Sequence, residues 1–165
     1  MTKDQEIALS APFSTDEIQW RICSTNRDKT SGCAVGYIDS RAIQNRFDNV
    51  LGKENWQNHF TAVPASNSKD QIANICTISI YYPDRKEWIV KSDGAGCTDI
   101  EPVKGGISDA FKRAASMWGC DRYMYELSEV WVDLENQKYI KRPEGYTKLR
   151  AAYEKGVARL FGKET

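Results

Sequence analysis

Residues 104–125 read KGGISDAFKRAASMWGCDRYMY, and the fold is best understood outward from this stretch. Because successive residues of a helix are about 100° apart, the apolar side chains here fall on one broad face. That face consists of Val103, Ile107, Ala110, Phe111, Ala114, Ala115, Met117 and Trp118. Gly119 stands where the C-cap of a helix is expected. The pattern therefore predicts a helix that ends near Trp118 and buries its apolar face.

The opposite face of this predicted helix is polar. Its centre holds Asp109, Lys112, Arg113 and Ser116, and Lys104 and Ser108 lie toward its edge. Two adjacent cations can hold phosphate oxygens, because Lys provides a point charge and Arg a planar fork of donors. A solvated surface helix is the other interpretation, with Asp109 and Arg113 paired at i,i+4. The ligand-binding interpretation depends on Lys112 and Arg113 lining a groove, and it would be contradicted if both formed intramolecular ion pairs or pointed away from any groove.

Composition sets the broad class. The chain has 165 residues, enough for one domain with a hydrophobic core. Its 23 basic and 23 acidic side chains balance, so net charge gives no support for nucleic-acid binding. From Lys138 onward, eight Lys and Arg stand against three Glu, which suits either phosphate contact or solubility. The N-terminus resembles no signal peptide and no apolar run matches a membrane span, so we expect a cytoplasmic protein.

The cysteines and the histidine argue against metal and cofactor chemistry. The five cysteines are Cys23, Cys33, Cys76, Cys97 and Cys120, and they form no C-x-x-C pair. The only histidine is His59, which we expect on a strand surface. A zinc site or an imidazole-based triad needs clustered ligands or an activated nucleophile nearby. We therefore expect reduced thiols, no structural metal and no cofactor.

The first half of the chain predicts two helices and a buried strand. Ser14 with Glu17 forms a capping box and Phe13 against Ile18 a hydrophobic staple, which predicts a short helix from Thr15 through Trp20. A loop or hairpin tip follows at residues 24–32, and then a buried strand at residues 33–38. Asp39 or Ser40 caps a second helix that Gly52 ends. Arg41 points away from the packed side of that helix, where it faces either a ligand or solvent.

Residues 56–94 change to a period of two, which predicts an antiparallel sheet of at least three strands. The turn sequence at residues 83–86 places Arg85 and Lys86 at a hairpin tip. The Gly-rich residues 92–101 leave three interpretations open: a tight connector, a phosphate nest, or a Mg²⁺ site formed by Asp93, Asp99 and Glu101. No Walker loop or dinucleotide fingerprint occurs, so no ATP site is visible.

After the main helix, the pattern predicts an edge strand or extended leg at residues 122–125. A final amphipathic helix is predicted over residues 146–161, with Lys148, Lys155 and Arg159 on its polar side.

Several short motifs together resemble the Rad52/22 family of single-strand annealing proteins, closest to its bacterial and phage branch that includes DNA damage response protein A (DdrA). The shared positions are Leu9, Pro12, Phe13, Ile18, Trp20, Gly36, Tyr37, Ile38, Asp39, Arg41, Gly52, Trp56, Lys91, Ser92, Asp93, Gly94, Gly96, Lys104, Gly105, Ile107, Ser108, Asp109, Ala110, Lys112, Arg113 and Ala114. The most specific part is residues 108–114, followed by Gly119 and Arg122-Tyr123-x-Tyr125. The resemblance covers about residues 9–132.

This resemblance implies an α+β fold with a β-β-β-α core, in which the sheet and the main helix wall a positively charged groove. Short N-terminal and C-terminal helices complete it. It also implies that protomers assemble into rings or arcs and that single-stranded DNA lies along the shared groove. Lys112 and Arg113 match helix cations that contact phosphates there, and Arg41 matches a further inner cation. Lys104, Arg85 and Lys86 fall near positions linked to an outer DNA contact.

Two positions complete the comparison with the family pattern. Arg122, in the matched Arg122-Tyr123-x-Tyr125 motif, joins the set of candidate DNA contacts. Asp121 stands where relatives often have Gly, which implies an added negative charge beside the groove.

The leading hypothesis is a non-enzymatic annealing protein. It is a single domain over residues 1–165, with a family-like core at about 9–132 and a basic helical extension at about 138–165. It binds single-stranded DNA without ATP, anneals complementary strands or protects DNA ends in repair and recombination, and associates with the nucleoid when bound. Its partners are further copies of itself and other recombination or single-strand-binding proteins. The rivals are a Mg-dependent nuclease that uses Asp93, Asp99 and Glu101, and a purely structural or protein-interaction module.

Overall fold

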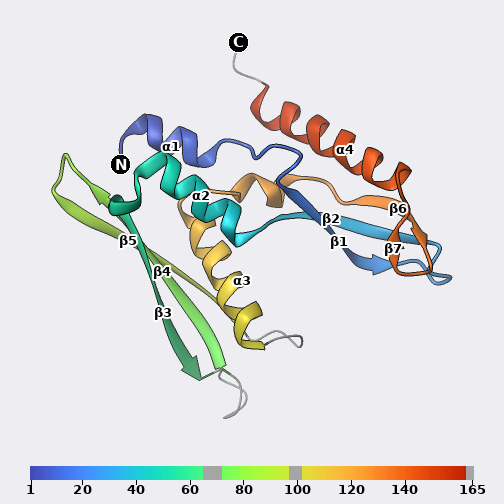
Figure 1. Cartoon of the computed structure of the whole chain (residues 1–165), viewed down its shortest axis with the longest axis horizontal. Helices are drawn as coiled ribbons and strands as arrows, with labels where there is room; N and C mark the ends of the chain where they lie inside the picture. Colours follow the sequence, from blue (N-terminus) through green and yellow to red (C-terminus); the bar gives the residue numbers. More distant parts are fainter. Residues whose placement is uncertain (65–71, 97–101, 163–165) are drawn as a thin grey trace. The chain divides into compact units, whose positions relative to one another are not determined.

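The computed structural model describes residues 1–64, 72–96 and 102–162, and for residues 102–104 it describes the backbone only (Figure 1). Helices and two antiparallel sheets are both present, and a helix packs on a sheet, which confirms the predicted α+β class. The chain divides into two units, each with its own sheet. Unit 1 comprises Met1–Ala11 and Ser40–Arg122, and unit 2 comprises Pro12–Asp39 and Tyr123–Thr165.

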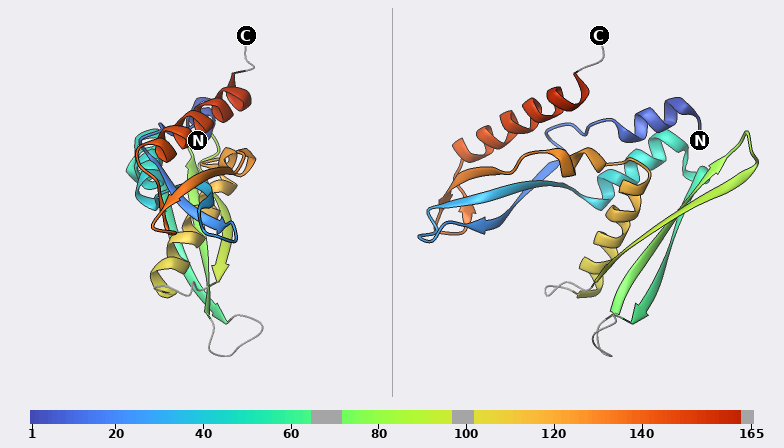
Figure 2. Two further views of the ribbon diagram at one scale, coloured as in Figure 1. Left: turned by 90° about the vertical axis from the view of Figure 1, so that its right-hand side faces the viewer. Right: turned by 180° about the vertical axis from the view of Figure 1, so that it is seen from behind.

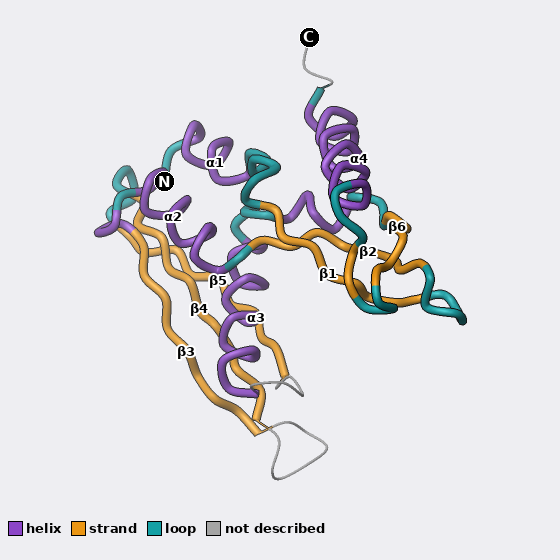
Figure 3. The backbone as a smooth tube through the Cα atoms, turned by 45° about the vertical axis from the view of Figure 1, so that its right-hand side comes forward, coloured by secondary structure: helices purple, strands orange, loops and turns teal. Residues whose placement is uncertain are grey.

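Unit 1 is built on the predicted three-stranded sheet. Its strands are β3 (Trp56–Pro64), β4 (Ile72–Tyr82) and β5 (Glu87–Gly96), in the spatial order β3-β4-β5. Both neighbouring pairs are antiparallel. The main helix α3 (Pro102–Met117) runs along one face of this sheet (Figure 3). His59 lies on β3 and is exposed, as predicted.

Most of the predicted apolar face of α3 is buried, but Met117, which was assigned to that face, is 42% exposed. Ala110, Ala114 and Ala115 are fully buried, because their small side chains let the helix approach the sheet closely. Phe111 is 2% exposed, and its ring centroid lies 6.3 Å from that of Trp56 on β3. The sheet contributes buried Cys76, Ile78 and Ile80 from β4. Gly119 follows the helix with φ of 90°, a left-handed conformation that glycine adopts without strain.

Two further helices and a short 3-10 turn complete unit 1. α1 (Lys3–Ser10) begins with a capping box between Thr2 and Gln5. It packs on α2 (Ser40–Leu51), and the Gln5 amide Nε2 donates to the Val50 carbonyl at 3.0 Å. α2 buries its predicted apolar face, consisting of Ile43, Phe47 and Leu51. Gly52, with φ of 85°, ends α2 and leads into η1 (Lys53–Asn55).

Unit 2 contains a four-stranded sheet that the sequence analysis did not predict. Its strands are β1 (Ile18–Thr25), β2 (Ser31–Ile38), β6 (Val130–Glu135) and β7 (Tyr139–Ile140), in the order β1-β2-β6-β7. The helix α4 (Glu144–Phe161) runs alongside these strands (Figure 2). Ala34, Val132, Ile140 and Leu149 form the buried cluster between sheet and helix. The predicted buried strand at 33–38 and the predicted last helix are both confirmed.

The predicted helix from Thr15 through Trp20 is wrong. The Ser14–Glu17 contact does form, since the Ser14 amide and hydroxyl both donate to Glu17 Oε2 at 3.0 and 2.9 Å. It closes a single turn, after which β1 begins at Ile18. β1 pairs with β2 along most of its length, from Ile18↔Ile38 to Thr25↔Gly32. Strand pairing therefore overrides the local helix-start signal, and the short N-terminal helix lies earlier, at α1.

The predicted edge strand at residues 122–125 is also wrong, because Arg122–Glu126 forms the 3-10 helix η2. Within unit 2, Tyr123 is turned inward and is 6% exposed. Its hydroxyl accepts from the Phe13 amide at 2.9 Å and lies 2.6 Å from the Tyr153 hydroxyl. Tyr123 is thus a buried, hydrogen-bonded tyrosine, whereas Tyr125 of the same segment is 72% exposed. None of the helices in the described ranges is long and apolar enough to cross a membrane.

Candidate nucleic-acid interface

The two cations at the centre of the polar face of α3 both form ion pairs. Lys112 Nζ lies 2.8 Å from Asp109 Oδ1, and Arg113 Nη2 lies 3.0 Å from Asp93 Oδ1 on β5. The Arg113 Nε also donates to Asp93 Oδ1, at 3.3 Å. In the free protein, each of these two side chains therefore has an acidic partner, which counts against its availability for a ligand. The predicted Asp109–Arg113 pair is wrong, because Asp109 pairs one residue earlier and Arg113 reaches across to the sheet.

The Lys112 side of α3 is partly covered. The hydroxyls of Ser40 and Ser108 lie 2.5 Å apart, which brings the first turn of α2 against α3. Lys112 lies one helical turn after Ser108, on the same side of α3, and its side chain is only 25% exposed. Arg41, in that first turn of α2, is exposed. The contact between Ser40 and Ser108 thus brings the turn that contains Arg41 against the side of α3 that contains Lys112.

A second pair of cations lies at the C-terminal end of α3. Arg122 donates through Nε to the Ser116 carbonyl and through Nη2 to the Met117 carbonyl, both at 2.8 Å. Lys91 on β5 donates to the Met117 carbonyl at 2.9 Å, and its ammonium lies 4.4 Å from the Trp118 ring centroid. Both cations donate hydrogen bonds to carbonyls in the last turn of α3, which have no partner within a helix. Their positive charges also complement the negative end of the helix dipole.

Lys91 and Arg122 are close enough to interact electrostatically. Burial lowers the pKa of Lys91, and the positive charge of Arg122 lowers it further, while Glu6 opposes the shift. An anion bound beside the two side chains would relieve this repulsion. Lys91 was not among the candidate contacts predicted from the sequence, although it stands in the family motif.

A hollow of about 360 Å³ adjoins this cation pair. Its lining consists of Met1, Lys3, Glu6, Ile7, Ser10, Tyr82, Lys91, Met117, Trp118, Gly119 and Arg122. Lys3 and Glu6 form an ion pair at 3.3 Å, so the net positive charge of the side chains that line the hollow comes from Lys91 and Arg122. The hollow is therefore a cationic concavity of unit 1, and Arg122 is the one predicted contact that lines it among those whose side chains the structure describes.

The hairpin between β4 and β5 carries Arg85 and Lys86 at its tip, as predicted. The Arg85 side chain is 68% exposed, 3.6 Å from Glu87 Oε1 and 6.0 Å from the Tyr82 ring centroid. Lys86 occupies the turn with φ of 54°. Because Tyr82 also lines the hollow, the base of this hairpin adjoins the cations at the end of α3. The Lys104 side chain lies outside the described residues.

Asp121 does not add a surface charge, which corrects the expectation drawn from the resemblance. Its side chain is 8% exposed, and its Oδ1 has no hydrogen-bond partner. Burial raises the pKa of the Asp121 carboxyl to about 7, and the charges of Lys112 and Arg46 oppose the shift. Its φ of 62° is a conformation that glycine adopts most readily. Near neutral pH this carboxyl is therefore partly protonated.

The proposed Mg²⁺ ligands are not assembled in the described part of the chain. Asp93 Oδ1 accepts from Arg113 and from the Gly94 amide, the latter at 2.7 Å. Asp99 and Glu101 lie outside the described residues. Asp93 is therefore held by a guanidinium and a backbone amide, and it does not belong to the cluster of potential metal ligands found among the described residues.

Comparisons with known proteins agree with the resemblance. A family model described as "Rad52/22 family double-strand break repair protein" matches residues 2–142. Two curated relatives are both named "Single-stranded DNA-binding protein DdrA", from Deinococcus radiodurans and Deinococcus deserti. They are 26% and 27% identical over 135 residues, which is 82% of this chain and 61% and 63% of the relatives. The chain thus spans about three-fifths of the length of these relatives. Because the family model matches well over half of the sequence, the chain belongs to the Rad52/22 family of double-strand break repair proteins.

Proposed function

We propose that this chain binds single-stranded DNA through the cations of unit 1 and promotes annealing of complementary strands without ATP. Family membership and the names of the two DdrA relatives support the ligand class. The observation that carries the proposal is the set of basic side chains around α3. Its members are Arg113 on the exposed surface, Arg122 and Lys91 at the helix end, Lys112 on α3, and Arg41 in the first turn of α2, where Ser40 contacts Ser108 of α3.

The Arg113–Asp93 ion pair is compatible with this role because the Arg113 side chain is exposed to solvent. The Arg113 side chain is 51% exposed and that of Asp93 27%. Exposed pairs contribute about 0–1 kcal/mol, so a phosphate replaces the carboxylate at little cost. Arg113 then serves as a phosphate contact that Asp93 holds in place in the free protein. Lys112, which is less exposed, contributes less.

Phosphate contacts of this kind give binding that depends on salt and is nearly independent of sequence. The bases remain free to search for complements, so annealing needs no nucleotide hydrolysis. The same contacts protect DNA ends, in the cytoplasm and on the nucleoid, alongside other recombination or single-strand-binding proteins. In this proposal residues 1–165 act as one annealing domain without catalytic activity.

Assembly into a ring or arc is part of the proposal. The face of the unit 1 sheet opposite α3 carries Trp88 and Val90, which are 42% and 54% exposed. The Trp88 ring lies 5.4 Å from that of Tyr81 on the neighbouring strand. Contiguous exposed apolar side chains of this kind are typical of protein contact surfaces. A neighbouring copy covers this face in the assembly.

The direct test is a gel shift of labelled single-stranded DNA with Mg²⁺ present. Retarded, intact DNA and faster annealing of complementary strands are expected for the wild type. Arg113→Ala with Arg122→Ala should lose most of this binding, whereas the charge-matched control Lys53→Ala with Lys155→Ala should keep it. Shortened DNA would support the nuclease instead, and an absent shift at low salt would support an interaction module. Equal binding by the two double variants would refute the assignment of the site.

A further inference from the structure

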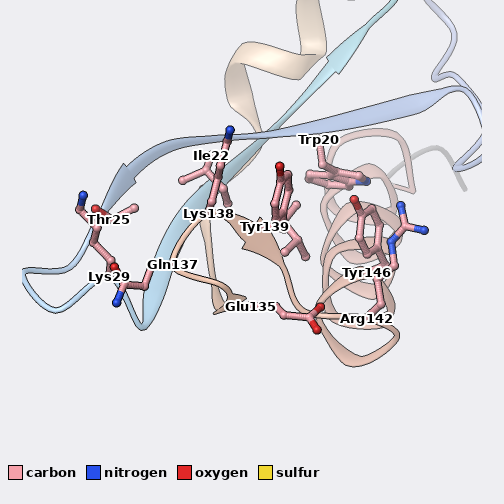
Figure 4. A pocket seen from close by; sticks show the side chains of 11 residues that line it. Trp20, Ile22, Thr25, Lys29, Glu135, Gln137, Lys138, Tyr139, Arg142 and Tyr146 are labelled. Atoms are coloured by element: carbon pink, nitrogen blue, oxygen red, sulfur yellow. The ribbon is translucent and has the colours of Figure 1, made fainter.

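A pocket of about 740 Å³ in unit 2 combines aromatic rings with cations (Figure 4). Its lining consists of Trp20, Ile22, Thr25, Lys29, Glu135, Gln137, Lys138, Tyr139, Ile140, Arg142 and Tyr146. These residues come from β1, the β1–β2 turn, the end of β6, the β6–β7 turn, β7, the turn that precedes α4 and the start of α4. Figure 4 shows the three rings of Trp20, Tyr139 and Tyr146 gathered toward one end.

The rings differ in how they are held. Trp20 and Tyr146 are partly buried and pack on the core cluster of unit 2, which fixes their orientation. Tyr139 is 58% exposed, so packing in the core does not explain why an aromatic residue stands at this position. The pocket therefore has two firmly held rings and one ring open to solvent.

The cations of the pocket lie against the same rings. The Arg142 guanidinium carbon is 4.9 Å from the Tyr146 ring centroid, and Lys138 Nζ is 5.4 Å from that of Tyr139. Together with Lys29, the lining contains three cations and one carboxylate, that of Glu135. Rings that stack on bases beside cations that contact phosphates are the usual means of binding single-stranded nucleic acid. The volume is within the range of small-molecule sites, about 300–1,000 Å³.

We propose that this pocket takes an unstacked nucleotide of single-stranded DNA, its base against Tyr139 and its phosphates on Lys138 and Arg142. The proposal rests on the proposed function and extends it to a base contact outside unit 1. It also assigns a role to part of the basic C-terminal segment, which the resemblance left without one.

The test compares two labelled oligonucleotides with equal numbers of phosphates, oligothymidylate and an abasic strand, by fluorescence anisotropy. The wild type should prefer the strand with bases by about fivefold or more. Tyr139→Ala should bring that ratio close to one while leaving abasic binding unchanged. Tyr139→Phe, which keeps the ring, and Tyr125→Ala, a control at an exposed tyrosine outside the pocket, should keep the preference.

Three results would overturn the proposal. Equal binding of both strands by the wild type refutes the pocket and leaves phosphate binding by unit 1 intact. A preference that survives in Tyr139→Ala places the base contact elsewhere. Binding of neither strand refutes the proposed function and this pocket together.

A separate observation concerns two thiols and a carboxylate of unit 2. Cys23 Sγ, Cys33 Sγ and a Glu129 carboxylate oxygen all lie within 4.8 Å of one another. The Cys33 thiol donates to Glu129 Oε2 at 3.3 Å, and the Cys23 thiol donates to the Cys33 carbonyl at 3.2 Å. The register of β1 against β2 shifts between Ile22 and Ser24, and this irregularity at Cys23 directs its side chain toward Cys33.

We infer that these three residues bind a thiophilic divalent cation such as Zn²⁺. A tetrahedral ion with Zn–S of about 2.3 Å and Zn–O of about 2.1 Å needs ligand atoms roughly 3.5–3.8 Å apart. The observed spacing requires only small side-chain movements, and water completes the fourth position. The ion ties the β1–β2 hairpin to the segment that precedes β6. The sequence analysis expected no metal because the ligands are scattered along the chain.

The test uses Co²⁺ with the full chain under a non-thiol reductant, since thiolate ligation gives a strong charge-transfer absorption. One Co²⁺ per chain should bind with that absorption, and Zn²⁺ should displace it. Cys23→Ala and Glu129→Gln change exposed residues and should abolish or weaken binding, whereas Cys120→Ala, at a free thiol of unit 1, should not. No thiolate absorption in the folded wild type, or full binding by Cys23→Ala, would overturn the inference.

Discussion

Replacing Asp93 with Asn removes the charged partner of Arg113 and leaves the backbone of β5 undisturbed. The Asn Oδ1 can still accept from the Gly94 amide, which Asp93 accepts at 2.7 Å. The lost pair is exposed, so we expect the variant to lose less than about 1 kcal/mol of stability. If phosphate must displace Asp93 from Arg113, the variant does not have to break this ion pair, and its free energy of DNA binding should be more favourable by the same amount. One kcal/mol corresponds to an affinity gain of about fivefold.

Fluorescence anisotropy with labelled oligothymidylate over a series of NaCl concentrations measures this gain. Asp93→Asn should bind up to about fivefold more tightly than the wild type at low salt. Asp28→Asn removes an exposed carboxylate from the β1–β2 turn and serves as the charge-matched control, for which we expect little change. Weaker or unchanged binding by Asp93→Asn would show that Arg113 is a structural partner of Asp93 and not a phosphate contact.

Three further results are expected. Asp121 has its folded pKa raised from 3.8 to about 7, so the folded state holds more protons and wild-type stability falls as pH rises between these values. The stability of Asp121→Asn relative to the wild type should increase through that pH window and level off above it. Thermal melts in which the difference between the two proteins stays the same at every pH would contradict this. Gly119→Ala places a Cβ at φ of 90°, so urea unfolding should show a loss of about 1 kcal/mol or more, and an unchanged midpoint would contradict the strain. Val90→Glu should reduce the assembled mass in light scattering, and unchanged assembly would exclude that sheet face as the contact.

Long periodic segments allowed much of the fold to be predicted. The main helix α3, the helix α2 ending at Gly52, the sheet β3-β4-β5 and the helix α4 each have one clear period over many residues. The sheet of unit 2 was missed because a local helix-start signal concealed β1 and because β2 pairs with a strand that is distant in sequence. β2 pairs with β6, with Cys33 opposite Trp131, and β6 is too short to show a pattern of its own.

The places of the cations along α3 were predicted from the sequence, but their contacts were not. Helical geometry places Lys112 and Arg113 on the polar face of α3, but only the folded sheet brings Asp93, 20 residues earlier, against Arg113. Lys91 on β5 and Arg122 after α3 also come close together only in the folded protein. Hydrogen bonds to the last carbonyls of α3 hold these two cations near each other, and no local sequence pattern predicts such bonds. The burial of Asp121 is likewise a tertiary effect.

The salt dependence of single-stranded DNA binding by the wild type and by Arg113→Ala with Arg122→Ala tests the central claim most directly. Each phosphate contact on a single strand contributes about 0.7 to the slope of log affinity against log salt. The double variant should therefore have a slope smaller in magnitude by about 1.4, with its fold unchanged by circular dichroism. Identical slopes for the two proteins would contradict the account.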